Sequence, residues 1–330
     1  MAQSAQTNSR LPSQRIPVGI SACLMGQSVR FNGSHKRSRF CTDVLSRYFD
    51  FRPLCPEVAI GMGTPREPIR LATTTPDDTN VRAIGTDNPE LDVTDALAEY
   101  GREQGQKQQL CGYIFMQKSP SCGLFGVKRY LANGHPEGTT RGIYAKHFCE
   151  QNPLLPVEEA GRLNDAGLLE NFMVRVFTYH EWQQLRAQPI GAHDLIDFHS
   201  RYKYLVMAHS AVHYKSMGRL LADLKAAPIN DIADEYFSQL MAALAKPASR
   251  KMHTNTLMHL QGYLKHLLSD EDKRELTAII EDYRLGIVPL VVPLTLLKHH
   301  LNHHEEANAY ARAQVYLNPH PYELGLRNRL

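Results

Sequence analysis

Short apolar segments bounded by turn residues recur along the first half of the chain. Five of them have the length and composition of β-strands: 16–22, 51–54, 69–74, 80–84 and 110–116. Amphipathic helical spacing lies between them at 41–49 and from Asp92 or Thr94 to 106. Strands that alternate with helices predict an α/β domain with a mostly parallel, Rossmann-like sheet.

The pattern changes near 152–156, after which apolar residues recur at helical spacing. Seven segments carry this spacing: 163–186, 190–209, 214–226, 229–245, 255–268, 270–285 and 288–304. Ser269 is placed to cap the start of one segment, and Gly286 follows its end. The second half is therefore predicted to be an all-α domain.

These patterns divide the chain into a lead-in (1–15), an α/β domain (16–165) and a helical domain (166–330). The 330 residues are 43% hydrophobic and 22% charged, which is typical of a globular protein. The lead-in is polar and lacks the apolar centre of a signal peptide, so we expect it to be disordered and the protein to be cytoplasmic. Apolar runs are too short for a membrane span, so no membrane partner is predicted.

The net charge of +3 gives no strongly basic overall field. Binding to a nucleic acid then requires local basic patches. One candidate is 199–204, where basic and aromatic residues interleave, a combination suited to phosphate contacts and base stacking. The candidate RNA contacts are Arg201, Lys203, Arg250, Lys251 and Lys298. The alternative interpretation is a solvated helix face, and no DNA partner is predicted.

Six cysteines all fall within the first 150 residues. Three of them, Cys23, Cys55 and Cys122, each follow a predicted strand. The sites of parallel α/β sheets lie in the crevice outside the carboxyl ends of the strands, so these sulfurs are expected at one edge. In a cytosolic protein, such cysteines are more often metal-binding or catalytic thiols than disulfides.

Three converging thiolates suit a soft metal centre. The two candidates are a tetrahedral zinc with an open fourth position and an iron–sulfur cluster that lacks one protein ligand. The spacing of Cys23, Cys55 and Cys122 matches no CxxC pattern. The alternative is that all six cysteines are ordinary small buried residues.

A carboxylate and a hydroxyl flank two of these cysteines. Glu57 lies two residues after Cys55, and Ser121 precedes Cys122. Beside a metal, these groups would form a general acid–base pair. The candidate substrate contacts, from the turn 118–123 and two glycine-containing loops, are Lys118, Ser119, Arg66 and Lys36. The alternative interpretation of these residues is as turn caps and surface side chains.

Three blocks of the first half carry a resemblance to a known family. Cys23-Leu24-Met25-Gly26, Cys55-Pro56-Glu57-Val58 and Ser119-Pro120-Ser121-Cys122-Gly123 resemble the signature blocks of the thiouracil desulfidase (TudS-like) family. The second half resembles a YbgA-like helical domain through three segments, 199–203, 256–263 and 289–294. The fused form is similar to desulfidases that remove sulfur from 4-thiouridine in tRNA.

The resemblance implies a [4Fe–4S] cluster held by Cys23, Cys55 and Cys122, with one iron left open. It implies non-redox hydrolysis in which Glu57 acts as acid–base, Ser121 positions the substrate or a proton, and uridine and sulfide are the products. Thiolated tRNA is then the expected partner. Two alternatives stay open: a desulfidase of free thiouracil or thiouridine, and a metal- or cluster-dependent sensor without turnover.

One loop departs from the family pattern. After Pro65-Arg66-Glu67-Pro68, the chain continues with Ile69-Arg70, where small relatives carry an acidic residue. We interpret this change as a sign of a larger, anionic substrate.

Overall fold

The computed structural model describes residues 14–75, 80–107, 109–131, 133–303 and 309–330. Two compact units make up the fold, one ending at Asn164 and the other beginning at Asp165. The predicted lead-in, 1–15, lies outside the described residues except for its last two positions. In the described part of the chain, no helix is long and apolar enough to cross a membrane.

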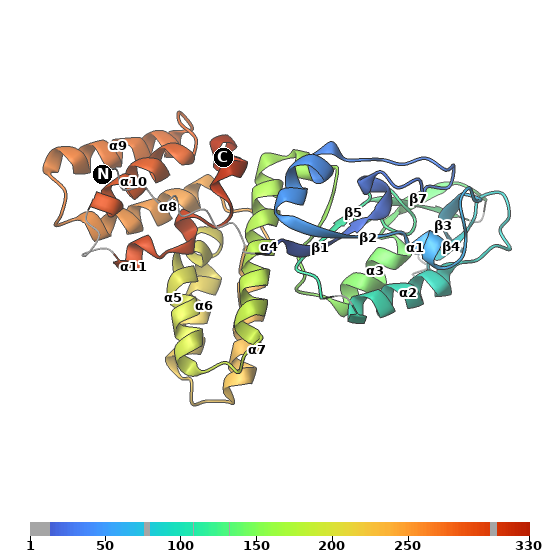
Figure 1. Ribbon diagram of the computed structural model, residues 1–330, viewed down its shortest axis with the longest axis horizontal. Helices are drawn as coiled ribbons and strands as arrows, with labels where there is room; N and C mark the ends of the chain where they lie inside the picture. Colours follow the sequence, from blue (N-terminus) through green and yellow to red (C-terminus); the bar gives the residue numbers. More distant parts are fainter. Residues whose placement is uncertain (1–13, 76–79, 108, 132, 304–308) are drawn as a thin grey trace. The chain divides into compact units, whose positions relative to one another are not determined.

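The first unit contains a parallel four-stranded sheet (Figure 1). Its strands are β1 (Ile16–Ser21), β2 (Phe49–Leu54), β5 (Tyr113–Phe115) and β8 (Val157–Glu159), in the order β2-β1-β5-β8. All three pairings are parallel. β1 is buried along nearly its whole length, as expected for a central parallel strand covered on both faces. The predicted α/β class is confirmed.

A second four-stranded sheet stands in the same unit. It has the order β4-β3-β6-β7 and contains β3 (Ile69–Thr73), β4 (Arg82–Gly85), β6 (Val127–Leu131) and β7 (Pro136–Thr140). Its β3–β6 pair is parallel, and its two outer pairs are antiparallel. β6, β7 and β8 are absent from the sequence prediction, because all three are short, β6 contains two charged residues and β7 is mostly polar.

Two helices, α2 (Thr94–Lys107) and α3 (Ile143–Gln151), pack against each other and against both sheets. Gly101 and Gly105 make the close approach possible, because a Cβ at either position would lie within 3 Å of α3 atoms or of Asn152 just beyond it. The aromatic rings of α3 pack on those of β5. In Figure 1, α2 and α3 lie below the strands of the parallel sheet.

The helix predicted for 41–49 is wrong. The chain forms a short π-helical turn at Phe40–Val44 and a 3-10 turn at Leu45–Arg47, and Phe49 already begins β2. A full helix would remove the first strand residue, which pairs with Ile16 in the parallel register. Pairing in the sheet therefore overrides the local helical spacing.

The second unit is helical, as predicted. Its helices are α4 (Ala166–Arg186), α5 (Ala192–His209), α6 (Ala211–Ala222), α7 (Ile229–Leu244), α8 (Arg250–Gln261), α9 (Asp270–Leu285), α10 (Val291–His303) and α11 (Ala309–Arg312). Trp182 anchors an aromatic core by stacking on Phe237 at a centroid distance of 4.9 Å. Ser249 and Ser269 cap two helix starts with their hydroxyls.

Candidate active site

Three neighbouring strands of the parallel sheet carry the three candidate cysteines to one edge. Cys23 lies in the 3-10 turn after β1, Cys55 follows β2, and Cys122 lies in the loop that follows β5. The chain passes from β1 to β2 on one side and later to β5 on the other side of β1. This reversal creates the crevice in which α/β sheets bind ligands.

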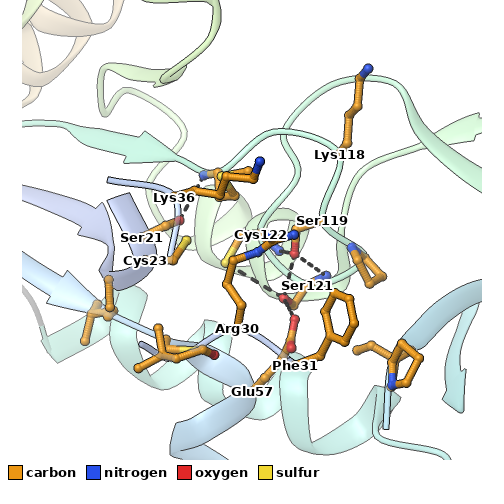
Figure 2. Close-up of a pocket in the computed structure, with 18 of the residues that line it drawn as sticks. Ser21, Cys23, Arg30, Phe31, Lys36, Glu57, Lys118, Ser119, Ser121 and Cys122 are labelled. Atoms are coloured by element: carbon orange, nitrogen blue, oxygen red, sulfur yellow. Dashed lines mark hydrogen bonds between the residues drawn. The ribbon is translucent and has the colours of Figure 1, made fainter. Parts of the chain in front are cut away.

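A cavity of about 480 Å³ opens at this edge. It is lined by every residue predicted for the desulfidase site: Cys23, Lys36, Cys55, Glu57, Arg66, Lys118, Ser119, Ser121 and Cys122. The structure thus brings together residues that are up to about a hundred positions apart in sequence. Their roles remain predictions. Lys118 is the outlying member, because its exposed side chain points away from the sulfur atoms in Figure 2.

All three thiols are free and hold their protons strongly. Burial raises the pKa of Cys23 to about 11, and the nearby Cys55 thiolate would add to this effect. Burial, followed by the negative charge of Glu57, raises the pKa of Cys122 further. Burial also raises the pKa of Cys55. Ionising these sulfurs at neutral pH therefore requires a strong positive partner in the cavity.

The described residues contain no group of three or more His, Cys, Asp or Glu side chains arranged to hold a metal ion. The thiols of Cys23, Cys55 and Cys122 nevertheless line one cavity. The zinc ion and the iron–sulfur cluster both remain predictions for this group of thiols.

Glu57 is held at both carboxylate oxygens. It lies in the short helix α1 (Pro56–Ala59), which starts immediately after Cys55. Its Oε1 accepts a hydrogen bond from the Ser121 hydroxyl at 2.5 Å. Its Oε2 accepts two hydrogen bonds from Arg66, from Nε at 2.8 Å and from Nη2 at 2.5 Å. The carboxylate therefore links the Ser121 hydroxyl to the Arg66 guanidinium.

The turn around Ser121 is shaped by Ser119. The Ser119 hydroxyl accepts hydrogen bonds from the backbone N–H groups of Ser121 at 3.3 Å and Cys122 at 3.1 Å. It also lies 3.0 Å from the Ser121 hydroxyl. A continuous hydrogen-bonded path thus runs from Ser119 through Ser121 to Glu57, which is an arrangement able to move a proton.

Helix α3 supports this turn from behind. Its first free N–H groups, on Ile143 and Ala145, donate to the carbonyls of Pro120 and Ser121 at 3.0 and 3.1 Å. The preceding Gly142 lies so close that a Cβ there would meet the Ser121 carbonyl oxygen at 2.5 Å. The orphan donors of a helix start therefore fix the turn that carries Ser119, Ser121 and Cys122. This helix, and the hydrogen bonds by which it holds the turn, are absent from the sequence prediction.

Two further residues of the cavity lie in the basic loop before residue 37. The Phe31 ring is 40% exposed, and the Arg30 guanidinium lies 5.7 Å from its centroid. Both line the cavity, and Figure 2 shows Phe31 near Glu57. A single aromatic residue in a polar loop gives no periodic signal, so its place in the site is visible only in three dimensions.

Comparison with known proteins finds two families along the chain. A family described as 2-thiouracil desulfurase matches residues 18–160, and a second family, a protein of unknown function (DUF1722), matches residues 203–321. The uncharacterised protein YbgA of Escherichia coli (strain K12) is 32% identical over 160 residues, which are 48% of this chain and 94% of YbgA. The chain belongs to the TudS-like desulfidases fused to a YbgA-like domain.

A solved structure of the [4Fe-4S]-dependent thiouracil desulfidase TudS is also similar to part of this chain. The two are 28% identical, with a TM-score of 0.35. The match covers 46% of this chain and 94% of TudS.

Two candidate RNA contacts of the YbgA-like domain lie on α5. Arg201 donates to Glu181 at 2.5 Å and to Asp197 at 3.3 Å, so its charge is matched within the domain. Lys203 lies about 6 Å from the centroids of two tyrosine rings, those of Tyr204 and Tyr214. Contact with RNA remains a prediction for both.

The other three candidates lie on α8 and α10. Arg250 donates to the Tyr283 carbonyl at 2.6 Å, and its guanidinium lies over the ring of the same tyrosine. Lys298 is partly buried and donates to Asn318 at 2.9 Å. Lys251 is exposed at the start of α8. These contacts give Arg250 and Lys298 roles within the domain, and their predicted contact with RNA is untested.

Proposed function

We propose that this protein removes sulfur from 4-thiouridine in tRNA by non-redox hydrolysis, which gives uridine and sulfide. The family supports the coarser statement, a desulfidase that cleaves the carbon–sulfur bond of a thiouracil. The observation that carries the proposal is the cavity in which three strand-end thiols meet the Glu57–Ser121 pair. A purely structural role for these residues offers no reason for an acid–base pair beside three free thiols.

The residues of the cavity fit a [4Fe–4S] cluster. Cys23, Cys55 and Cys122 would hold it, and these are the only cysteines among the described residues that line the cavity, so one iron would lack a protein thiolate. When bound, such a cluster supplies a soft Lewis-acidic iron, which prefers a thiocarbonyl sulfur to an oxygen. The raised pKa of the Cys23 thiol is consistent with a site that ionises only on loading.

The protein's own groups handle the protons of the reaction. Replacement of sulfur by oxygen uses one water: its oxygen bonds to the ring carbon, and its two protons end on the departing sulfide. Glu57 Oε1 is placed to accept a proton from that water through the Ser121 hydroxyl, and to return it to the leaving sulfur. The hydrogen bond from Ser119 orients the Ser121 hydroxyl for this transfer.

The cations of the cavity rim suit an anionic substrate. Lys36, Arg30 and Lys118 contribute positive charge around the cavity, whereas Glu57 is already paired with Arg66. Excess positive charge at the mouth attracts the phosphates that flank a nucleoside in RNA. This distribution favours thiolated tRNA over a free base as the substrate.

The first test is a nucleoside digest. Anaerobically reconstituted protein is incubated with thiolated tRNA, and 4-thiouridine is measured after digestion. We expect 4-thiouridine to fall and uridine to rise, and Glu57→Gln to slow the reaction about 100-fold or more. Cys23→Ala, Cys55→Ala and Cys122→Ala should lose iron and sulfide, whereas Cys149→Ala, a free cysteine outside the cavity lining, should retain both.

Three results would refute parts of the proposal. Turnover of free 4-thiouracil with none on tRNA would identify a free-base desulfidase. Stoichiometric zinc in a colourless, fully active protein would exclude the cluster. A cluster-containing protein that binds thiolated ligands without turnover, and binds equally well as Glu57→Ala, would be a sensor.

A further inference from the structure

We propose that Arg66 is a positioning residue that fixes the carboxylate of Glu57, and that it makes no contact with the substrate. From the sequence, Arg66 is predicted to be a substrate contact. Its surroundings assign a different role. This inference rests on the proposed function, because it concerns the acid–base group of that reaction.

All five N–H donors of the Arg66 guanidinium are already used. Nε and Nη2 donate to Oε2 of Glu57, and Nη2 also donates to the Val29 carbonyl at 2.9 Å. Nη1 donates to the Gly63 carbonyl at 2.8 Å and to the Thr64 hydroxyl at 3.3 Å. The side chain is only 4% exposed. A guanidinium has five donors in a fixed fork, so no donor remains for a substrate phosphate or carbonyl.

The fork determines which oxygen of Glu57 is reactive. Both hydrogen bonds to the carboxylate converge on Oε2, so Oε1 is left to face Ser121. Without the planar fork, the carboxylate could rotate and exchange its two oxygens. The pairing also compensates the partly buried negative charge, since the Glu57 side chain is only 13% exposed.

Arg66 also holds in place the loop residues Val29 and Phe31, which line the cavity. Its backbone N–H donates to the Phe31 carbonyl at 2.8 Å, in addition to the side-chain bond to Val29. The Val29 carbonyl is in turn 3.7 Å from the Cys55 sulfur, which donates to it. One side chain therefore connects the acid–base group, the cavity loop and a candidate cluster ligand.

The test compares Arg66→Gln and Arg66→Lys with Arg82→Gln. Arg82 is a matched control in the same unit, because it pairs with Asp92 and Asp95 but does not line the cavity. We expect Arg66→Gln to lower kcat about 10- to 100-fold, with KM within about threefold and iron content unchanged. Arg66→Lys keeps the charge without the fork, so its kcat should lie between those of Arg66→Gln and the wild type. Arg82→Gln should match the wild type.

A double-mutant cycle separates positioning from a general structural role. If Arg66 acts through Glu57, adding Arg66→Gln to Glu57→Gln should change the residual kcat by less than about threefold. Additive losses would overturn the inference. A raised KM with unchanged kcat in Arg66→Gln would restore the substrate contact, and unchanged values of both kcat and KM would remove any role in the reaction.

A second readout does not depend on turnover. In Arg66→Gln, backbone amides of the 26–37 loop should exchange with deuterium about tenfold faster than in the wild type or in Arg82→Gln, because the loop loses its tie at Val29. Unchanged exchange would contradict the loop contact. Wild-type protein without desulfidase activity would refute the proposed function separately, and the exchange measurement would still decide the position of Arg66.

Discussion

Ser119 and Ser121 are two positions apart but have different hydrogen-bond partners. The Ser121 hydroxyl donates to Glu57, whereas the Ser119 hydroxyl accepts from the backbone N–H groups of Ser121 and Cys122. One hydroxyl thus belongs to the acid–base pair. The other holds the backbone on which a candidate cluster ligand stands.

Substitution of the two serines should therefore affect different properties of the protein. Ser121→Ala is expected to lower kcat about 100-fold while iron content stays near the wild-type value, because the short hydrogen bond to Glu57 is lost, whereas the contact with the Cys122 sulfur is long, at 3.8 Å. Ser119→Ala should lower iron content as well, because each lost hydrogen bond to the turn costs about 1 kcal/mol near Cys122. Iron assay and steady-state kinetics on both variants check this. Equal iron loss in the two would contradict the division of roles.

At the residue scale, the sequence indicates the types of side chain but not their partners. Cys23, Cys55 and Cys122 could be grouped because each follows a strand and strand ends share an edge. Glu57 and Ser121 follow from their closeness to two of these cysteines. The role of Arg66 could not be inferred, because two of its four acceptors, on Val29 and Glu57, reach it only in the folded chain.

At the element scale, β1 and β5 were predictable because they are apolar and central in the parallel sheet, whereas only residues 51–54 of the edge strand β2 were predicted. The missed elements are short or polar and gain their stability from neighbours. Helix α3 is the most important of them, since its first turn holds the carbonyls of Pro120 and Ser121. Its amphipathic signal spans only nine residues and follows directly after a polar hairpin.

The approach of α3 to the turn can be tested at Gly142. Its φ of −63° is accessible to any residue, so a side chain there would act only through its volume. A valine would meet the Ser121 carbonyl, and we expect Gly142→Val to cost about 1–3 kcal/mol in the free energy of unfolding and to lower kcat. Gly218→Ala is the control, because open space surrounds that position in α6 and alanine favours a helix by about 1 kcal/mol. Thermal unfolding with equal stability for Gly142→Val and wild type would exclude the close contact.

At the scale of the whole molecule, the helical unit is built around a buried ionic group. Nε of Arg327 donates to Glu170 of α4 at 3.1 Å, and Nη1 of the same side chain donates to the Tyr316 carbonyl at 2.6 Å. Burial acts to raise the pKa of Glu170, but His320 and Arg327 together hold it well below its usual value. Nearby, burial and the charge of Arg327 lower the pKa of His253 to about 3.

The lowered pKa of His253 predicts that the helical unit loses stability in acid. Unfolded histidine binds a proton below about pH 6.5, whereas folded His253 does so only near pH 3. Between these values the unfolded state binds more protons, so stability is complete above pH 6.5 and falls as the pH is lowered. Each pH unit in that window costs at most about 1.4 kcal/mol for one such histidine.

Circular dichroism at 222 nm during heating measures this loss. The melting temperature should fall between pH 7.5 and pH 5 for the wild type, and less steeply for His253→Gln, which does not titrate. Equal slopes for the two proteins would show that another group is responsible.

The order of strands β2-β1-β5 has a consequence for how the protein is assembled. A cluster held by positions 23, 55 and 122 would close two long loops of the chain, and such cross-links lower the entropy of the unfolded state more than that of the folded sheet. The cofactor would then stabilise the folded state in addition to its part in the reaction. Because the three thiols meet only after the sheet has formed, loading would follow folding, and the donor of iron and sulfide would meet a finished fold.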